Sequence, residues 1–192
     1  MSYIDAYKKI CFIHIAKNGG RSISKYLINI AGPSEQFEGE QHRGWWFQGG
    51  GHSTYYTAKL LFPEINNWFA FVIIRDPVDR VYSAWQGYEM WGHAITFADF
   101  LNYIENLKDN SPLWEAGKWV HNPHDIREME EIYADPIAVY AHIAPQHFYF
   151  DQKSKSLRFY SFRDLFKFKE DLPADFQRNI KIYDSYNNQN IH

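Results

Sequence analysis

"ICFIHIAKNGGRSIS", residues 10–24, joins a short apolar run to an amphipathic segment through a glycine-containing loop. The apolar run, residues 10–15, is typical of a β-strand that is buried on both faces. Isoleucine and leucine then recur at helical spacing, which predicts an α-helix. A plain turn between these two elements needs one glycine and no lysine. Lys17 together with Gly19 and Gly20 indicates instead a loop built to hold a phosphate.

A second stretch repeats this arrangement. Residues 68–77, "WFAFVIIRDP", are rich in β-branched and aromatic side chains and predict another buried strand. Pro77 suits the first turn of a helix that follows it. Two strand–turn–helix units predict an α/β fold with a central parallel β-sheet flanked by helices. Further elements are predicted as a short helix within 52–62, an amphipathic helix capped by Thr96, a strand at 157–162 and a closing helix at 171–186.

Length and composition indicate one soluble globular domain, residues 1–192. Hydrophobic residues make up 45% and aromatic residues 19% of the sequence, which excludes a disordered chain. The net charge of −3 gives no overall basic field, so we expect no nucleic-acid partner. Cys11 is the only cysteine, which excludes an intramolecular disulfide and suits a reducing compartment. We see neither a secretory signal nor an apolar run near the ~18 residues of a membrane span, and therefore expect a cytoplasmic protein.

The loop at residues 16–20 has the composition of a phosphate cradle. In α/β folds, ligands bind at the carboxyl ends of strands and at helix N-termini. Backbone N–H groups form an anion-binding nest there, while Lys17 adds charge and Ser22 a hydroxyl. The loop is not a Walker A motif, because its lysine precedes the glycines instead of following them. The alternative is a tight turn with a solvated lysine.

Arg75 and Ser83 form a second candidate site. Arg75 follows the second predicted strand, where a guanidinium can bind a phosphate through two parallel hydrogen bonds. Ser83 lies eight positions later, two turns into the predicted helix. The alternative for Arg75 is a salt bridge to Asp76, Asp79 or another carboxylate. Two loops suited to phosphates in one small domain indicate a ligand with two phosphate-like groups.

These segments resemble a known family, the sulfotransferases that depend on PAPS (3′-phosphoadenosine 5′-phosphosulfate). "FIHIAKNGGRS", residues 12–22, is similar to their first signature, and "FVIIRDPVDRVYSAW", residues 71–85, is similar to their second. The resemblance is to the carbohydrate branch related to heparan sulfate 2-O-sulfotransferases, and it implies a P-loop-NTPase-like sulfotransferase fold. Gly51-His52 stands where the family carries its catalytic histidine, and "HIAPQHFYF", residues 142–150, resembles a late Pro-Gln element.

The resemblance implies an enzyme that moves a sulfuryl group from PAPS to an acceptor with a free hydroxyl, expected to be a glycan. It implies His52 as the base that takes the hydroxyl proton and Lys17 as the stabiliser of charge on the bridging oxygen. No metal is required for this reaction. The residues that the resemblance places around the cofactor are Lys17, Asn18, Gly19, Gly20, Arg21 and Ser22 at the 5′-phosphate and Arg75 and Ser83 at the 3′-phosphate.

The chain departs from the family signature in the first loop. Ala16 replaces a proline, and Asn18 and Arg21 each replace a threonine. Asn18 can still donate to a phosphate, and Arg21 adds positive charge at a helix N-terminus. We therefore expect the chemistry to be retained, with changes in loop stiffness and ligand affinity.

Several alternatives stay open at this point. A nucleotide-kinase-like phosphoryl transferase and a non-catalytic nucleotide-binding module would use the same fold. His42, in the same loop as His52, is the alternative base, and His14 is expected to be a core histidine. Arg80 is expected to brace the second loop through a carboxylate, and the alternative is a contact with the 3′-phosphate. The sequence pattern leaves the acceptor and the oligomeric state open.

Overall fold

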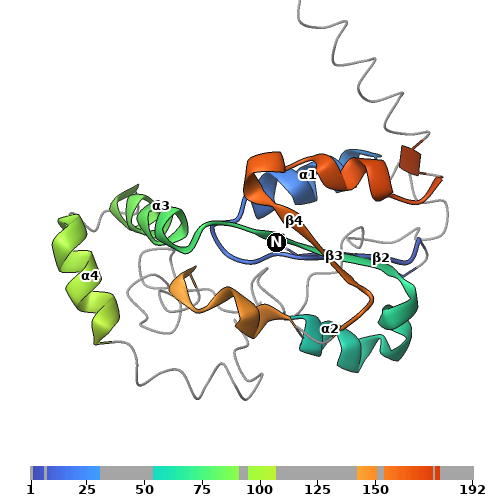
Figure 1. The fold of residues 1–192 in the computed structure, drawn as a ribbon, viewed down its shortest axis with the longest axis horizontal. Helices are drawn as coiled ribbons and strands as arrows, with labels where there is room; N and C mark the ends of the chain where they lie inside the picture. Colours follow the sequence, from blue (N-terminus) through green and yellow to red (C-terminus); the bar gives the residue numbers. More distant parts are fainter. Residues whose placement is uncertain are drawn as a thin grey trace, which may run out of the picture.

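The computed structural model describes residues 2–6, 8–30, 54–90, 95–106, 142–150, 154–174 and 176–177. The strands are β1 (Tyr3–Asp5), β2 (Ile10–Ile13), β3 (Phe69–Ile74) and β4 (Leu157–Ser161), which form one sheet in this order (Figure 1). β2, β3 and β4 run parallel, and β1 lies antiparallel beside β2. The parallel centre confirms the predicted α/β architecture. β1 is an addition that the sequence analysis did not predict.

Most of the helices begin where the sequence predicts them. They are α1 (Gly20–Ile30), α2 (Tyr55–Leu61), α3 (Pro77–Met90) and α4 (Phe97–Glu105), with short 3-10 helices η1 (Pro63–Asn67), η3 (Gln146–Tyr149), η4 (Phe162–Asp164) and η5 (Lys167–Asp171). Pro77 opens α3, and the Thr96 hydroxyl accepts a hydrogen bond from the Asp99 N–H at the start of α4, as predicted. The predicted closing helix does not begin at residue 171, which instead ends η5, and residues 172–173 are not helical. Residues 178–186 of that helix lie outside the described residues. Among the described residues, no helix is long and apolar enough to cross a membrane.

Side chains along the central strand alternate between two buried clusters. Phe71 and Ile73 of β3 belong to one cluster, and Ala70 and Val72 belong to the other. All four are at most 1% exposed. Successive side chains of a strand point to opposite faces, so a strand that is apolar throughout must be covered on both sides. This requirement explains why the sequences of β2 and β3 are continuous apolar runs.

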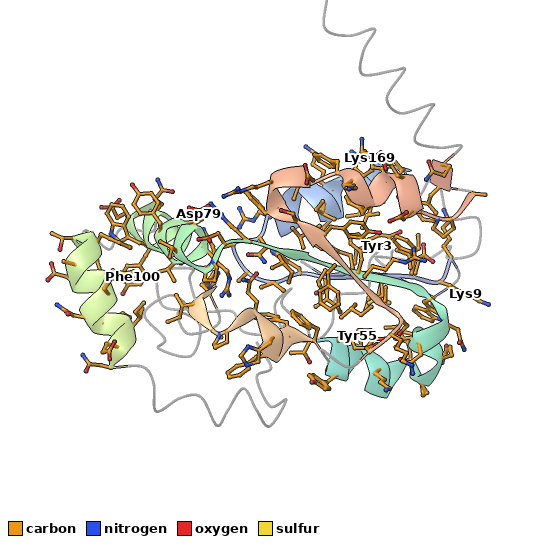
Figure 2. All side chains as sticks on the ribbon, viewed as in Figure 1. Tyr3, Lys9, Tyr55, Asp79, Phe100 and Lys169 are labelled. Carbon is orange, nitrogen blue, oxygen red and sulfur yellow. The ribbon has the colours of Figure 1, made fainter. Side chains whose placement is uncertain are left out.

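Different elements cover the two faces of the sheet. α1 and residues 162–174 lie on one face, whereas α2 and residues 142–150 lie on the other (Figure 1). Figure 2 shows Lys169 on the first side and Tyr55 on the second. The result is a three-layer arrangement in which the sheet is the middle layer.

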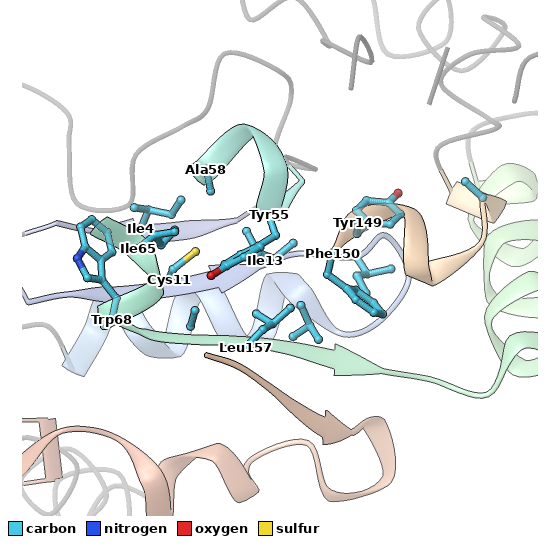
Figure 3. Packing of buried hydrophobic residues seen from close by; sticks show 14 of the residues in the cluster. Ile4, Cys11, Ile13, Tyr55, Ala58, Ile65, Trp68, Tyr149, Phe150 and Leu157 are labelled. Carbon is cyan, nitrogen blue, oxygen red and sulfur yellow. The ribbon is translucent and has the colours of Figure 1, made fainter. Parts of the chain in front are cut away.

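Aromatic packing holds these layers together. On the α1 side, the ring of Phe71 stacks on Phe168 and on Phe12, with centroids 4.7 and 5.0 Å apart respectively. On the α2 side, Cys11 and Tyr55 pack in the same apolar cluster (Figure 3). Burial raises the pKa of the Cys11 thiol, so this group stays protonated and behaves as a small apolar side chain.

The register of the parallel strands brings their carboxyl ends to one edge of the sheet. Ile13 of β2 pairs with Val72, and Ile74 of β3 pairs with Ser161 of β4. The residues that follow these three strands therefore leave the sheet at the same edge. α1 and α3 both begin there. Open parallel sheets bind their ligands at this edge.

Candidate active site

The loop between β2 and α1 has the backbone of an anion-binding nest. Lys17 and Gly19 both have positive φ, 65° and 74°, with Asn18 between them. Alternation of left-handed and right-handed residues turns successive N–H groups toward one concavity. α1 begins immediately afterwards, at Gly20, and the first N–H groups of a helix have no intrahelical acceptor. The N–H groups of Asn18 and Ser22 already donate to the carbonyl oxygens of Ile15 and Gly19, at 3.2 and 3.1 Å, so an anion at this edge would bind the remaining N–H groups of the loop and of the first helical turn.

Each glycine of this loop is required for a different reason. Gly19 has a left-handed φ of 74°, which residues with a side chain rarely adopt. A Cβ atom at Gly20 would lie 1.7 Å from Cδ2 of His14. His14 is only 6% exposed, and its backbone N–H donates to the Ser2 hydroxyl oxygen at 3.0 Å. The prediction of a core histidine is therefore confirmed, and its ring supports the start of α1.

Three cations converge at this edge: Lys17, Arg21 and Arg75, which we call the cationic cluster. Burial lowers the pKa of the Lys17 ammonium, and the nearby charges of Arg21 and Arg75 lower it further. All three causes disfavour the charged form of Lys17. A bound anion would act in the opposite direction and relieve the repulsion. The electrostatics of the cluster therefore favour a negatively charged ligand.

Arg75 links the two predicted loops directly. Its Nη1 donates to the carbonyl oxygen of Lys17 at 2.9 Å, and its guanidinium lies 4.4 Å from the ring centroid of Phe162. Asp76 does not pair with it, because Asp76 Oδ1 accepts from the N–H groups that open α3, those of Val78 and Asp79. Among the described residues, Arg75 forms a salt bridge with neither Asp76 nor Asp79. Arg75 is held by a carbonyl and an aromatic ring, which leaves its charge uncancelled.

Asn18 points into the protein instead of toward the loop opening. Its Nδ2 donates to the carbonyl oxygen of Ile73 and to Oε1 of Gln146, both at 2.6 Å. The side chain is 1% exposed. Both amide hydrogens are therefore engaged within the protein. A direct bond from this side chain to a phosphate would require one of these contacts to break, so we assign Asn18 a supporting role.

Arg80 supports the first loop through hydrogen bonds from its buried guanidinium. It is 2% exposed, and it donates through Nε to the carbonyl oxygen of Ala16 and through Nη1 to that of Ala144, at 2.9 and 2.6 Å. Its Nη2 has no partner among the described residues. Burial lowers the pKa of this guanidinium, while the adjacent Tyr149 hydroxyl acts in the opposite direction. The prediction that Arg80 braces the second loop through a carboxylate is therefore wrong, because its acceptors in the described structure are backbone carbonyls of the first loop and of Ala144.

The remaining predicted residues fall into two groups. Ser22 is exposed in the first turn of α1, and Ser83 is half-buried in α3. Their contacts with a ligand stay predictions. His52 and the alternative base His42 lie outside the described residues, as does Gly51. Within the described ranges, no three His, Cys, Asp or Glu side chains are grouped so that they could hold a metal ion.

Sequence reasoning missed the role of Gln146. The Pro-Gln element was noticed only as part of a family resemblance, without a function for the glutamine. Its side chain contacts Arg75, 71 positions away, and Asn18, 128 positions away. No local pattern reports contacts over such separations. Gln146 lies in η3, outside the sheet, so its contacts with Asn18 and Arg75 follow only from the tertiary structure.

The contact between Gly20 and His14 leads to a prediction about stability. We expect Gly20→Ala to lower the free energy of unfolding by about 1–3 kcal/mol or more, because the new methyl group would overlap the imidazole. The same substitution in a His14→Ala background should have an effect below about 1 kcal/mol, since the ring is gone and alanine favours the helix. Urea denaturation of the four proteins measures both effects. Equal losses in the two backgrounds would show that the contact does not constrain Gly20.

Comparison with known proteins agrees with the geometry of this edge. The family model described as "Sulfotransferase family" matches residues 2–124, which is more than half of the chain. This range contains both β2–α1 and β3–α3 loops. Neither the curated proteins nor the solved structures contain a match. The chain belongs to the sulfotransferase family.

Proposed function

We propose that this protein transfers a sulfuryl group from PAPS to a hydroxyl of a carbohydrate, in a P-loop-NTPase-like sulfotransferase fold. The observation that carries the proposal is the cationic cluster at the carboxyl edge of the sheet, where burial of Lys17 and the nearby charges of Arg21 and Arg75 all lower the pKa of its ammonium. PAPS has two separate anionic groups, a 5′-phosphosulfate and a 3′-phosphate. Two neighbouring loops with cations match a ligand of this kind, and family membership supports sulfuryl transfer.

The two loops would take different parts of the donor. The N–H groups at the start of α1 and the Ser22 hydroxyl bind the 5′-phosphate in this proposal, with Arg21 supplying further charge. Arg75 and Ser83 bind the 3′-phosphate. Asn18 holds the first loop in place through its contacts with Ile73 and Gln146. Adenosine 3′,5′-bisphosphate, the product, would occupy the same contacts after transfer.

The reaction is an in-line displacement at sulfur. The acceptor oxygen forms a bond to sulfur while the bond from sulfur to the bridging oxygen of the 5′-phosphate breaks. Charge grows on that bridging oxygen, and the Lys17 ammonium stabilises it there. The hydroxyl proton passes to His52, whose ordinary pKa of about 6.5 suits a base at neutral pH. As in phosphoryl transfer, positioning and electrostatics supply most of the rate enhancement.

Thermal shift distinguishes this proposal from a kinase-like phosphoryl transferase. We expect adenosine 3′,5′-bisphosphate at 100 times its Kd to stabilise the fold by about 2.7 kcal/mol. For a domain of this size that is a rise in Tm of roughly 5–10 °C. ATP with Mg²⁺ should give a much smaller rise. An equal or larger rise with ATP would contradict the proposal.

A matched pair of arginine variants locates the binding. Arg75→Ala should remove most of the Tm rise produced by the bisphosphate, because it removes the cation assigned to the 3′-phosphate. Arg158→Ala is the control, since Arg158 is exposed on β4 and stacks on Phe69 at the start of β3, away from the carboxyl edge. It should leave the rise unchanged. Loss of the rise in both variants would point to general destabilisation.

The lowered pKa of Lys17 predicts how binding depends on pH. In the free protein Lys17 loses its proton below the ordinary pKa of 10.5, whereas a bound anion holds the proton on. Affinity for the bisphosphate should therefore fall as pH rises through the free-protein pKa of Lys17, by up to about tenfold per pH unit. Titration calorimetry between pH 7.5 and the alkaline limit of stability measures this slope.

Two variants test the assignment of that slope. Lys17→Arg should flatten it, because a guanidinium stays charged throughout this range. Lys25→Arg, on the exposed side of α1, should keep the slope of the parent protein. The same steep slope in Lys17→Arg would show that another group is responsible.

The base assignment predicts a separation of transfer from binding. His52→Ala should lower transfer of labelled sulfuryl groups from PAPS to carbohydrate hydroxyls by about 10²–10⁴-fold, since general base catalysis contributes that much. Affinity for adenosine 3′,5′-bisphosphate should stay within twofold of the parent value. His42→Ala is the matched control. If His42→Ala loses transfer and His52→Ala does not, the base is His42, and absence of transfer by the parent protein would favour a non-catalytic binding module.

A further inference from the structure

The Gln146 side chain makes three hydrogen bonds to the two loops of the candidate site. Its Oε1 accepts from the Arg75 N–H at 3.0 Å and from Asn18 Nδ2 at 2.6 Å. Its Nε2 donates to the Arg75 carbonyl oxygen at 2.7 Å. One side chain thus contacts the residue after β3 and the loop after β2.

These contacts continue the sheet where its strands end. β2 pairs with β3 only as far as Ile13 and Val72, and β4 pairs only as far as Ser161 and Ile74. Arg75 is the next residue, and none of the described strands pairs with its backbone. The Gln146 amide binds both its N–H and its carbonyl oxygen, as a neighbouring strand would. Backbone groups that are half-buried in this way need such partners.

Asn18 does the same for the backbone of Ile73. Its Nδ2 donates to the carbonyl oxygen of Ile73, one residue beyond the last β2 pair, and also to Gln146. The side-chain amide of Asn18 therefore links the loop that carries Lys17 both to β3 and to Gln146. Two side-chain amides replace the missing strand contacts and join both loops.

The segment that carries Gln146 is itself firmly held. Arg80 donates to the carbonyl oxygen of Ala144, two residues before Gln146, and also to that of Ala16 in the first loop. Tyr149 is fully buried three residues after Gln146, with its hydroxyl beside Arg80. A polar side chain can position other groups only if its own backbone is fixed. Here anchors lie on both sides of Gln146.

We propose that Gln146 is a positioning residue that sets the separation between Lys17 and Arg75. This inference rests on the proposed function, in which Lys17 lies near the 5′-phosphate and Arg75 binds the 3′-phosphate. Gln146 holds Arg75 through its backbone and holds the Lys17 loop through Asn18. A ligand with two phosphates gains from both loops only when their separation is preset, because its second contact then forms at high effective concentration.

The test compares a ligand with two phosphates and a ligand with one. Titration calorimetry gives the Kd of adenosine 3′,5′-bisphosphate and of adenosine 5′-monophosphate for the parent protein and for Gln146→Ala. The preference is the Kd of the monophosphate divided by the Kd of the bisphosphate. We expect this ratio to be at least tenfold smaller in Gln146→Ala than in the parent protein, while the Kd of the monophosphate changes less than threefold. General loosening of the fold would weaken both ligands together, so the ratio reports positioning.

Two further variants complete the experiment. Gln177→Ala is the matched control, because the Gln177 amide also donates to backbone carbonyls, those of Lys169 and Leu172, near the far end of the chain. It should leave the ratio unchanged. Gln146→Glu is nearly isosteric and keeps the acceptor for Asn18 and Arg75 while losing the donor to the Arg75 carbonyl. It gives the same ratio measurement if Gln146→Ala fails to fold, and we expect a reduced ratio there as well.

The outcomes separate the two proposals. A parent protein that binds the bisphosphate no more tightly than the monophosphate would overturn the two-phosphate site and the role of Gln146 with it. A parent protein that prefers the bisphosphate, together with position-146 variants that keep the full preference, would overturn the role of Gln146 alone. Loss of the preference at position 146, with Gln177→Ala unchanged, would support both.

Discussion

The parallel pairing of β2 and β3 is the constraint on which the candidate site depends. Their register sets Ile13 opposite Val72, so the strands end within a few residues of each other at one edge. Lys17 and Arg75, 58 positions apart in sequence, come close enough there for a hydrogen bond between the Arg75 guanidinium and the Lys17 carbonyl. In an antiparallel pair the two carboxyl ends would lie at opposite edges, and no shared site could form. The continuous apolar sequence of β3, which is buried on both faces, favours this parallel pairing. The pairing in turn determines where Lys17 and Arg75 meet.

The site that this register creates is unfavourable without a ligand. Lys17 combines a left-handed backbone, which costs about 1–3 kcal/mol for a residue other than glycine, with a partly buried charge next to two arginines. Arg80 is buried as well, with carbonyl acceptors and no acidic partner among the described residues. Such strain persists only where the surrounding structure enforces it. The aromatic layers around Phe71 and the cluster around Tyr55 supply that rigidity on the two faces of the sheet.

Local patterns in the sequence were sufficient to predict the main strands and helices, but they were insufficient to predict the long-range side-chain contacts between them. Apolar runs identified β2 and β3, Pro77 and Thr96 identified helix starts, and the glycines identified the first loop, because each signal acts over a few residues. The carboxylate partner predicted for Arg80 is wrong, and the contacts of Asn18 with Ile73 and Gln146 were not predicted, since a polar side chain is ambiguous until its neighbours in space are known. β1 escaped prediction because three residues that pair only with β2 carry no periodic signal of their own.

The choice of neutral amides at the sheet edge follows from the charge of the site. Where β2 and β4 stop, the backbone of Ile73 and Arg75 needs hydrogen-bond partners, and a carboxylate could have accepted from the Arg75 N–H as well as Gln146 does. A carboxylate there could not donate to the Arg75 carbonyl, and its negative charge would cancel part of the field that attracts an anion. An amide carries a donor and an acceptor without net charge. The amides of Asn18 and Gln146 can thus complete the sheet while the cationic cluster keeps its full positive potential for a ligand.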